Sequence, residues 1–167
     1  MPAIPDWALA LTFWIHFLAA VTLVGSLVAT SILVLPAAQT LDPLEQLNLI
    51  ANIQKRMEPT AWFSLSLLIV TGLFQMSVNI HYNGFLSVSN QWTIAILVKH
   101  ILVVTLIVVS AVQSWDVLPT IRRLLLRKDK ASQEEALKLR GREAWLLYAN
   151  LILAILILGA TAFMRAA

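Results

Sequence analysis

Three ionisable residues lie inside long apolar stretches of the sequence: His16, Lys99 and His100. An ionisable side chain within a membrane-spanning helix costs about 2.5 to 3.5 kcal/mol on insertion scales, so its presence indicates a partner or a function. His16 follows Trp7 by nine residues and His100 follows Trp92 by eight, and tryptophan is typical of the membrane interface. If the two stretches are parallel helices, both imidazoles lie roughly 12 Å below the outer boundary.

Two imidazoles at one depth on parallel helices are able to bind one iron from opposite faces of a porphyrin. This pattern predicts a haem b site with His16 and His100 as axial ligands. Lys99 is expected to meet a haem propionate or to reach lipid phosphate at the outer interface. Counting along the expected helices places small or amide side chains near the same depth: Gly72, Gln75, Gly159, Ala160, Ala19 and Ala20.

Other interpretations of the histidines stay open at this point. Neutral imidazoles hydrogen-bonded between helices are common in membrane proteins, and a bound metal ion is a third possibility. Copper(I) favours sulfur ligands, but the sequence has no cysteine and its four methionines do not cluster. A copper site would use His16, His81 and either Met76 or His100.

The sequence contains no Ser/His/Asp arrangement, glycine-rich phosphate loop or HExxH motif. Hydrolysis and phosphoryl transfer therefore have no support, and redox chemistry or transport remains. Enzyme activity of the chain alone is uncertain, and if present it would be that of a membrane oxidoreductase. Nothing indicates a nucleic-acid partner.

The elements that must position the histidines are long apolar helices. Of the 167 residues, 59% are hydrophobic and 13% charged, which indicates a membrane protein. About 20 apolar residues span the hydrocarbon layer. Four stretches meet this test, residues 8–35, 61–80, 92–115 and 144–164, and they predict an all-α, integral membrane, up-and-down four-helix bundle in a lipid bilayer. Residues 1–167 are expected to form one transmembrane domain.

Charge predicts the orientation of the bundle. Eight of the twelve Lys and Arg residues lie in the connection 116–143, and short basic loops stay cytoplasmic. Both termini are therefore expected outside the cytoplasmic (inner) membrane. Asp42 and Pro43 predict a short amphipathic helix before the second span, and Ser132 predicts the capped start of the last helix near Gln133. Prolines 36, 59 and 119 are expected at the edges of the spans.

Several short motifs, in this order, resemble the copper resistance protein D (CopD) domain. They are Trp14-Ile15-His16-Phe17-Leu18-Ala19-Ala20, Lys55-Arg56 leading to Val70-Thr71-Gly72-Leu73, Trp92 through Lys99-His100 to Pro119, and Leu139-Arg140-Gly141-Arg142-Glu143. The resemblance implies a four-helix inner-membrane module associated with copper uptake or tolerance. It is also distantly similar to HemJ-type protoporphyrinogen oxidases, which bind haem b and use an intramembrane His of the first helix and a Lys of the third. The matching positions here are His16 and Lys99, whereas His100 is an addition that favours a bis-histidine cytochrome.

Three functional hypotheses follow. The first is a haem b membrane cytochrome in electron transfer, with quinone or other membrane redox subunits as partners. The second is a CopD-like copper transport or tolerance protein. The third is a cofactor-free accessory subunit of a membrane complex.

Overall fold

The protein consists of long helices in every part that the computed structural model describes, residues 5–78, 91–127 and 129–166. Four helical rods are each long and apolar enough to cross a membrane, with a mean hydropathy between 1.4 and 2.5 over their most apolar windows. This confirms the predicted all-α, four-span architecture. The rods are α1 (Asp6–Val28) with η1 (Ala29–Val34) and α2 (Leu35–Ala38); α3 (Pro43–Ser77); α4 (Gln91–Val112) with η2 (Gln113–Val117) and α5 (Leu118–Leu126); and α6 (Lys130–Ala166).

The rods run further than the sequence indicated, because the prolines do not end them. The expected short helix after Asp42 is instead the first part of α3, which continues through Pro59. Pro36 and Pro119 also lie within continuous rods, each directly after the π-helical turns of η1 or η2. A proline ring clashes with the carbonyl four residues earlier, which here belongs to Ile32 or Trp115 inside those π-helical turns. We infer that the wider π turns accommodate the prolines, so helix continues where an edge was expected.

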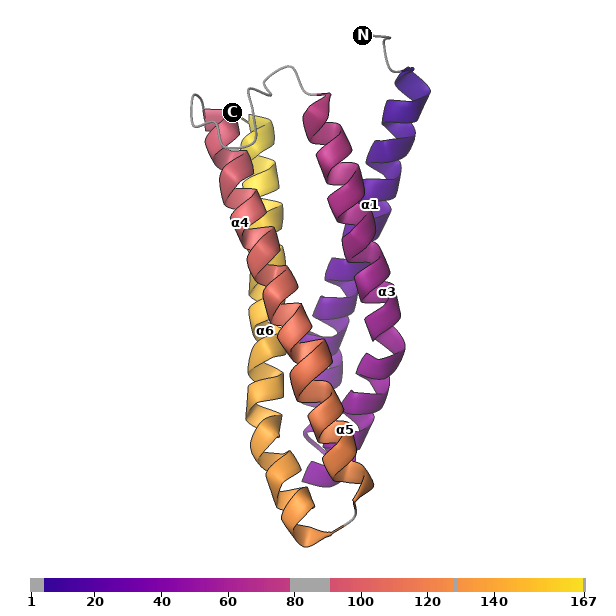
Figure 1. The fold of residues 1–167 in the computed structure, drawn as a ribbon, viewed down its shortest axis with the longest axis vertical. Helices are drawn as coiled ribbons and strands as arrows, with labels where there is room; N and C mark the ends of the chain where they lie inside the picture. Colours follow the sequence, from indigo (N-terminus) through magenta and orange to yellow (C-terminus); the bar gives the residue numbers. More distant parts are fainter. Residues whose placement is uncertain (1–4, 79–90, 128, 167) are drawn as a thin grey trace.

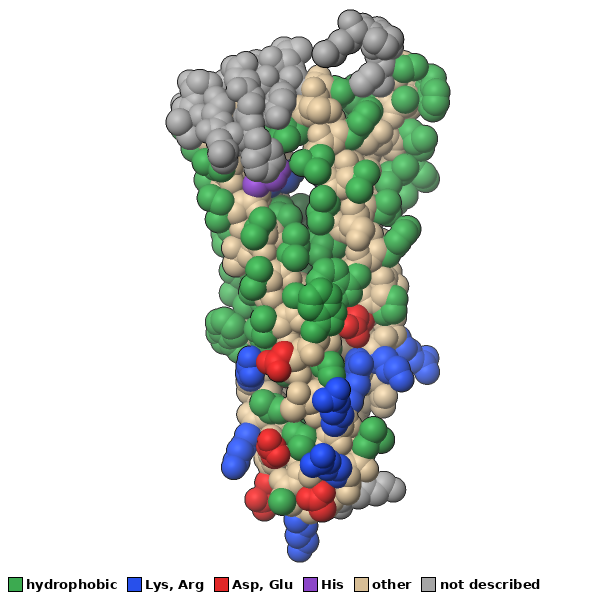
Figure 2. All heavy atoms as spheres, viewed as in Figure 1, with side chains coloured by type: hydrophobic (Ala, Val, Ile, Leu, Met, Phe, Trp, Pro, Cys, Tyr) green, Lys and Arg blue, Asp and Glu red, His purple; other side chains and the backbone are tan. Residues whose placement is uncertain are grey.

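The rods pair as two hairpins, α1 with α3 and α4 with α6 (Figure 1). The largest buried cluster ties α3, η2, α5 and α6 together at the end that carries the charged connections; a second lies at mid-height. Near the other end, the described residues form a small buried cluster of Met76 against Ile96. Large apolar side chains such as Phe17 and Phe63, each 65% exposed, cover the outside, as expected of a surface that faces lipid. Figure 2 shows the charged side chains gathered towards the lower end.

Buried amides join the second hairpin. Asn150 of α6 donates through Nδ2 to Gln113 Oε1 of η2 at 2.9 Å, and Ser110 of α4 donates to Asn150 Oδ1 at 3.1 Å. These hydrogen bonds hold η2 and α4 against α6 inside the bundle.

The last helix begins at Lys130 and is capped by Asp129, so the predicted cap at Ser132 is wrong. The Asp129 Oδ1 atom accepts the backbone N–H of Ser132 at 2.8 Å. This backbone hydrogen bond, followed by one from the Ser132 hydroxyl, lowers the pKa of Asp129. An ionised carboxylate is a better acceptor at a helix start than the neutral acid.

We therefore expect Asp129→Ala to speed amide hydrogen exchange in the first turn of α6. Because the folded-state pKa is depressed, the unsubstituted cap contributes fully above the ordinary aspartate pKa and is lost as pH falls through the lowered value. Exchange corrected for intrinsic rates should show this loss in the unsubstituted protein only at acidic pH. Glu134→Ala, an exposed change in the next turn, is the control. Equal exchange in both variants would contradict the assignment of the cap.

Candidate intramembrane histidine site

His16 of α1 is held by a hydroxyl of α3. Its Nδ1 atom lies 2.7 Å from Thr71 Oγ1, and the half-buried ring faces that helix. The Thr71 hydroxyl donates its own proton to the carbonyl of Leu67, one turn earlier in α3. Thr71 Oγ1 therefore accepts from the imidazole, so Nδ1 carries the ring proton. The lone pair of His16 is then on Nε2, where it is available to a ligand.

Gly72 and Gln75 lie beside His16, as the depth count predicted. A Cβ atom on Gly72 would be 3.4 Å from His16 Cε1, so the glycine leaves room for the imidazole against α3. Gln75 donates through Nε2 to the carbonyl of Thr12 at 3.4 Å, one turn before His16 on α1. These contacts fix the face of α1 that carries the histidine against α3.

His100 of α4 has the same tautomer for a different reason. Its Nδ1 atom lies 2.7 Å from the carbonyl oxygen of Ile96, one turn earlier in the same helix. A carbonyl only accepts, so Nδ1 donates and the lone pair is again on Nε2. The side chain is half-buried. Two histidines that the sequence proposed as ligands thus both keep the nitrogen lone pair that a metal requires.

Lys99 belongs to α4, directly before His100, whereas His16 belongs to α1 in the other hairpin. Met76 of α3 packs against Ile96 of α4, so the two hairpins are in contact near this end of the bundle. Figure 2 shows histidine and basic side chains together in the otherwise apolar upper part of the molecule. The structure thus brings His16 and Gly72 together, with Gln75 against α1 one turn away.

Thr71 was missed by sequence reasoning, and its replacement tests the orientation of His16. In Thr71→Val, Nδ1 loses its acceptor, so the ring is free to rotate and to exchange tautomers. Loss of such an orienting partner typically costs about 10- to 100-fold in metal affinity. We expect a loss of this size in haem affinity, measured by titrating the haem-free protein. Thr105→Val is the matched control, because that exposed hydroxyl donates only to Ile101 of its own helix; equal losses in both variants would contradict the role of Thr71.

The described residues offer little for a metal ion bound by side chains alone. Among residues 5–78, 91–127 and 129–166, no group of three or more His, Asp or Glu side chains lies close enough to hold one. His81, the third residue of the copper hypothesis, lies outside these ranges. Haem needs only two axial ligands from the protein, since the porphyrin supplies the other four donors.

Two further buried polar residues, Gln54 of α3 and Glu143 of α6, were also missed. They are hydrogen-bonded to each other within the bundle, through Gln54 Nε2 and Glu143 Oε1. Glu143 stands at the end of the basic connection, one residue before the apolar stretch, so composition alone indicated a solvated residue. The only indication of a partner for Glu143 in the sequence was the amide of Gln54 in the first connection.

Comparison with known proteins gives one match. A family model described as copper resistance protein D matches residues 51–164, more than half of the chain. The match includes α4 with Lys99 and His100, and most of α3 and α6, but stops short of His16 on α1. No curated protein and no solved structure matches the chain.

Proposed function

We propose, on the premise that this chain belongs to the copper resistance protein D family, that it is a membrane cytochrome that binds haem b and passes single electrons. His16 and His100 are the proposed axial ligands. Gly72 lies against the ring of His16, Gln75 bonds to α1 one turn away, and Lys99 is proposed to meet a haem carboxylate. The proposal would make the chain an electron-transfer subunit rather than an enzyme on its own.

The observation that carries this proposal is the common hydrogen bonding of the two imidazoles. Each ring donates its Nδ1–H within the protein, to Thr71 or to the Ile96 carbonyl. Histidines that ligate metals almost always donate their other ring N–H to such a partner. Bound haem would supply a one-electron iron couple. The residues of this chain hold the rings, and the apolar helices around them restrict access of water.

The same proposal includes the arrangement in the membrane. Residues 1–167 are proposed to form a single domain of the inner membrane, with both termini outside and the basic connection 116–143 in the cytoplasm. Other membrane redox subunits or quinone are the proposed electron partners. The lipid bilayer is the surrounding implied by the four apolar helices.

Copper handling is the second candidate, and the family match favours it. Copper would be cargo, bound in passage by His16 and His81 with either Met76 or His100. Met76 is 8% exposed and packs on Ile96, so its thioether faces the interior rather than lipid. A thioether is a ligand that copper(I) accepts.

The test is the visible spectrum of the protein purified in mild detergent from cells supplied with a haem precursor. A reduced α band that appears on adding dithionite would support the cytochrome. A colourless protein from such cells would reject it. Copper stoichiometry after equilibrium dialysis then tests the second candidate, and co-purification with other subunits without haem or copper would favour an accessory role.

A further inference from the structure

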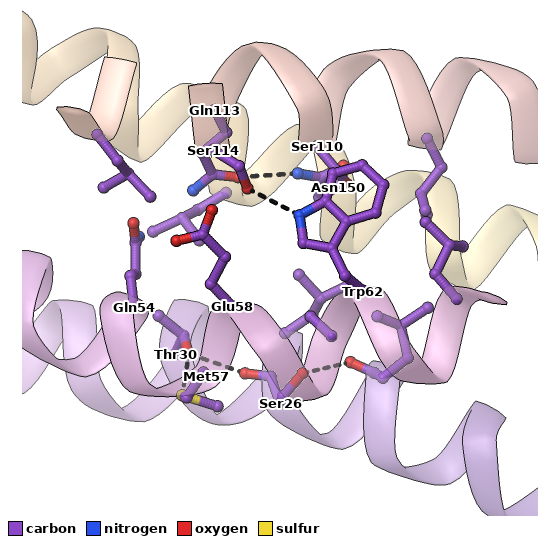
Figure 3. A pocket seen from close by; sticks show the side chains of 17 residues that line it. Ser26, Thr30, Gln54, Met57, Glu58, Trp62, Ser110, Gln113, Ser114 and Asn150 are labelled. Carbon is purple, nitrogen blue, oxygen red and sulfur yellow. Dashed lines mark hydrogen bonds between the residues drawn. The ribbon is translucent and has the colours of Figure 1, made fainter. Parts of the chain in front are cut away.

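A cavity lined by apolar side chains and a set of polar ones lies between the rods (Figure 3). Its α4 and η2 residues begin with Leu106, six residues or roughly 9 Å after His100, and its polar residues Ser110 and Ser114 lie further along the helix. Both π-helical segments border it, η1 through Thr30 and η2 through Gln113 and Ser114. π-helical turns inside α-helices are frequent at functional sites.

The size of the cavity decides what can occupy it. Its volume is about 90 Å³. An engineered apolar cavity of about 150 Å³ holds one benzene, while a water molecule takes about 30 Å³ in the liquid. The cavity is thus too small for an aromatic headgroup but has room for about three waters. Hydroxyl, amide and carboxylate groups on its wall supply the hydrogen bonds that such waters need.

Gln54 links this cavity to a buried carboxyl group. Gln54 is on the cavity wall and is 7% exposed, and its Nε2 donates to Oε1 of Glu143, which is 1% exposed. Two buried atoms of the pair have no protein partner, Gln54 Oε1 and Glu143 Oε2. In Figure 3, Gln54 and Glu58 extend from α3 towards the space below η2. Water in the cavity would be a partner for the free amide oxygen.

The neighbouring charges do not neutralise Glu143. Arg122 of α5 pairs with Glu58 of α3 at 3.7 Å and also reaches the carbonyl of Ala51. Arg142, adjacent to Glu143 in α6, pairs with Asp116 of η2 at 3.1 Å. These two arginines are thus each paired with a carboxylate other than Glu143. An ionised carboxylate buried without a cation is costly, so the neutral acid is the form that this site favours.

We propose that Glu143 is a buried proton-binding carboxyl group, and that water in the cavity beside Gln54 exchanges its proton with the aqueous phase. The O–H bond at Glu143 Oε2 breaks as a water oxygen takes the proton, and the reverse step restores the acid. Gln54 holds the carboxyl group through Oε1 and orders the water through its own free oxygen. The proposal needs neither haem nor copper, so it stands or falls separately from the proposed function.

The experiment is infrared spectroscopy of the purified protein in lipid nanodiscs, in H₂O and after transfer to D₂O. A protonated carboxylic acid gives a carbonyl-stretch band that ionised carboxylates lack, and exchange to deuterium shifts it. At neutral pH we expect this band in the unsubstituted protein, its loss in Glu143→Gln and its retention in Glu58→Gln. Absence of the band, or its retention in Glu143→Gln, would overturn the proposal.

Gln54 is tested by the rate of the deuterium shift. We expect Gln54→Leu to slow the shift at least tenfold. Gln46→Leu is the matched control, since Gln46 is also a buried glutamine of α3 with a free Oε1 but does not border the cavity. Equal rates in the two leucine variants, or no shift in the unsubstituted protein, would contradict the role of the cavity. The band and its shift are measured in the unsubstituted protein, so the proposal stays testable if a variant fails to fold.

Discussion

The reduced α band is expected to disappear in His16→Ala and, separately, in His100→Ala. In the proposed cytochrome, each substitution would remove one of the two histidines that hold the iron. Neither helix offers a replacement ligand one turn away, because the residues there are Thr12 and Ala20 for His16, and Ile96 and Val104 for His100. We expect haem content to fall to near zero in each variant, measured as the haem-to-protein ratio of protein purified in mild detergent.

The controls separate ligand loss from a general loss of packing. Phe17→Ala and Ile101→Ala change the residues next to each histidine, and both side chains are mostly exposed on the lipid-facing surface. These variants should keep the band. Imidazole added to either alanine variant should restore part of it by occupying the vacated position. Full haem content in His100→Ala would contradict a bis-histidine site even if His16→Ala were colourless.

Depth along the helices was predictable from the sequence. A fixed rise per residue and the tryptophans at the helix ends placed Gly72 and Gln75 near His16, and the structure agrees. Rotation about each helix axis was not predictable in the same way. Thr71 precedes Gly72 by one residue and contacts Nδ1 of His16. The apolar pattern of α3 does not show that Thr71 lies on the face of the helix that meets His16.

The buried pair of Gln54 and Glu143 could not be predicted from the sequence for a different reason. Gln54 and Glu143 are 89 residues apart in the chain, and each lies among charged residues that sequence reasoning assigns to water. Their burial depends on α3 and α6 continuing as helices beyond the apolar stretches. The prolines and charges in the sequence had indicated that the helices would end there. Hydropathy identifies the part of a helix that crosses the lipid, whereas packing between helices determines where the helix ends.

Gly72→Leu is expected to lower haem affinity at least tenfold, or about 1.4 kcal/mol. A Cβ at position 72 already reaches 3.4 Å from His16 Cε1, which is ordinary contact, so alanine should be tolerated. Leucine adds three further carbons beyond that atom, and they must displace either the imidazole or α1. Displacement of the ring breaks its hydrogen bond to Thr71 and moves Nε2 from its position. The measurement is haem titration of the haem-free variants.

Gly159→Leu is the matched control for this substitution. A Cβ on Gly159 would meet no atom within 4 Å, and Gly159 was also expected near the depth of the histidines. It changes the same residue type within an apolar helix without touching His16. Because leucine favours helix by up to about 1 kcal/mol relative to glycine, a loss of affinity in Gly72→Leu alone reflects contact with the imidazole rather than a weakened helix. Equal affinity in Gly72→Leu and Gly72→Ala would show that the space beside His16 is not needed for haem.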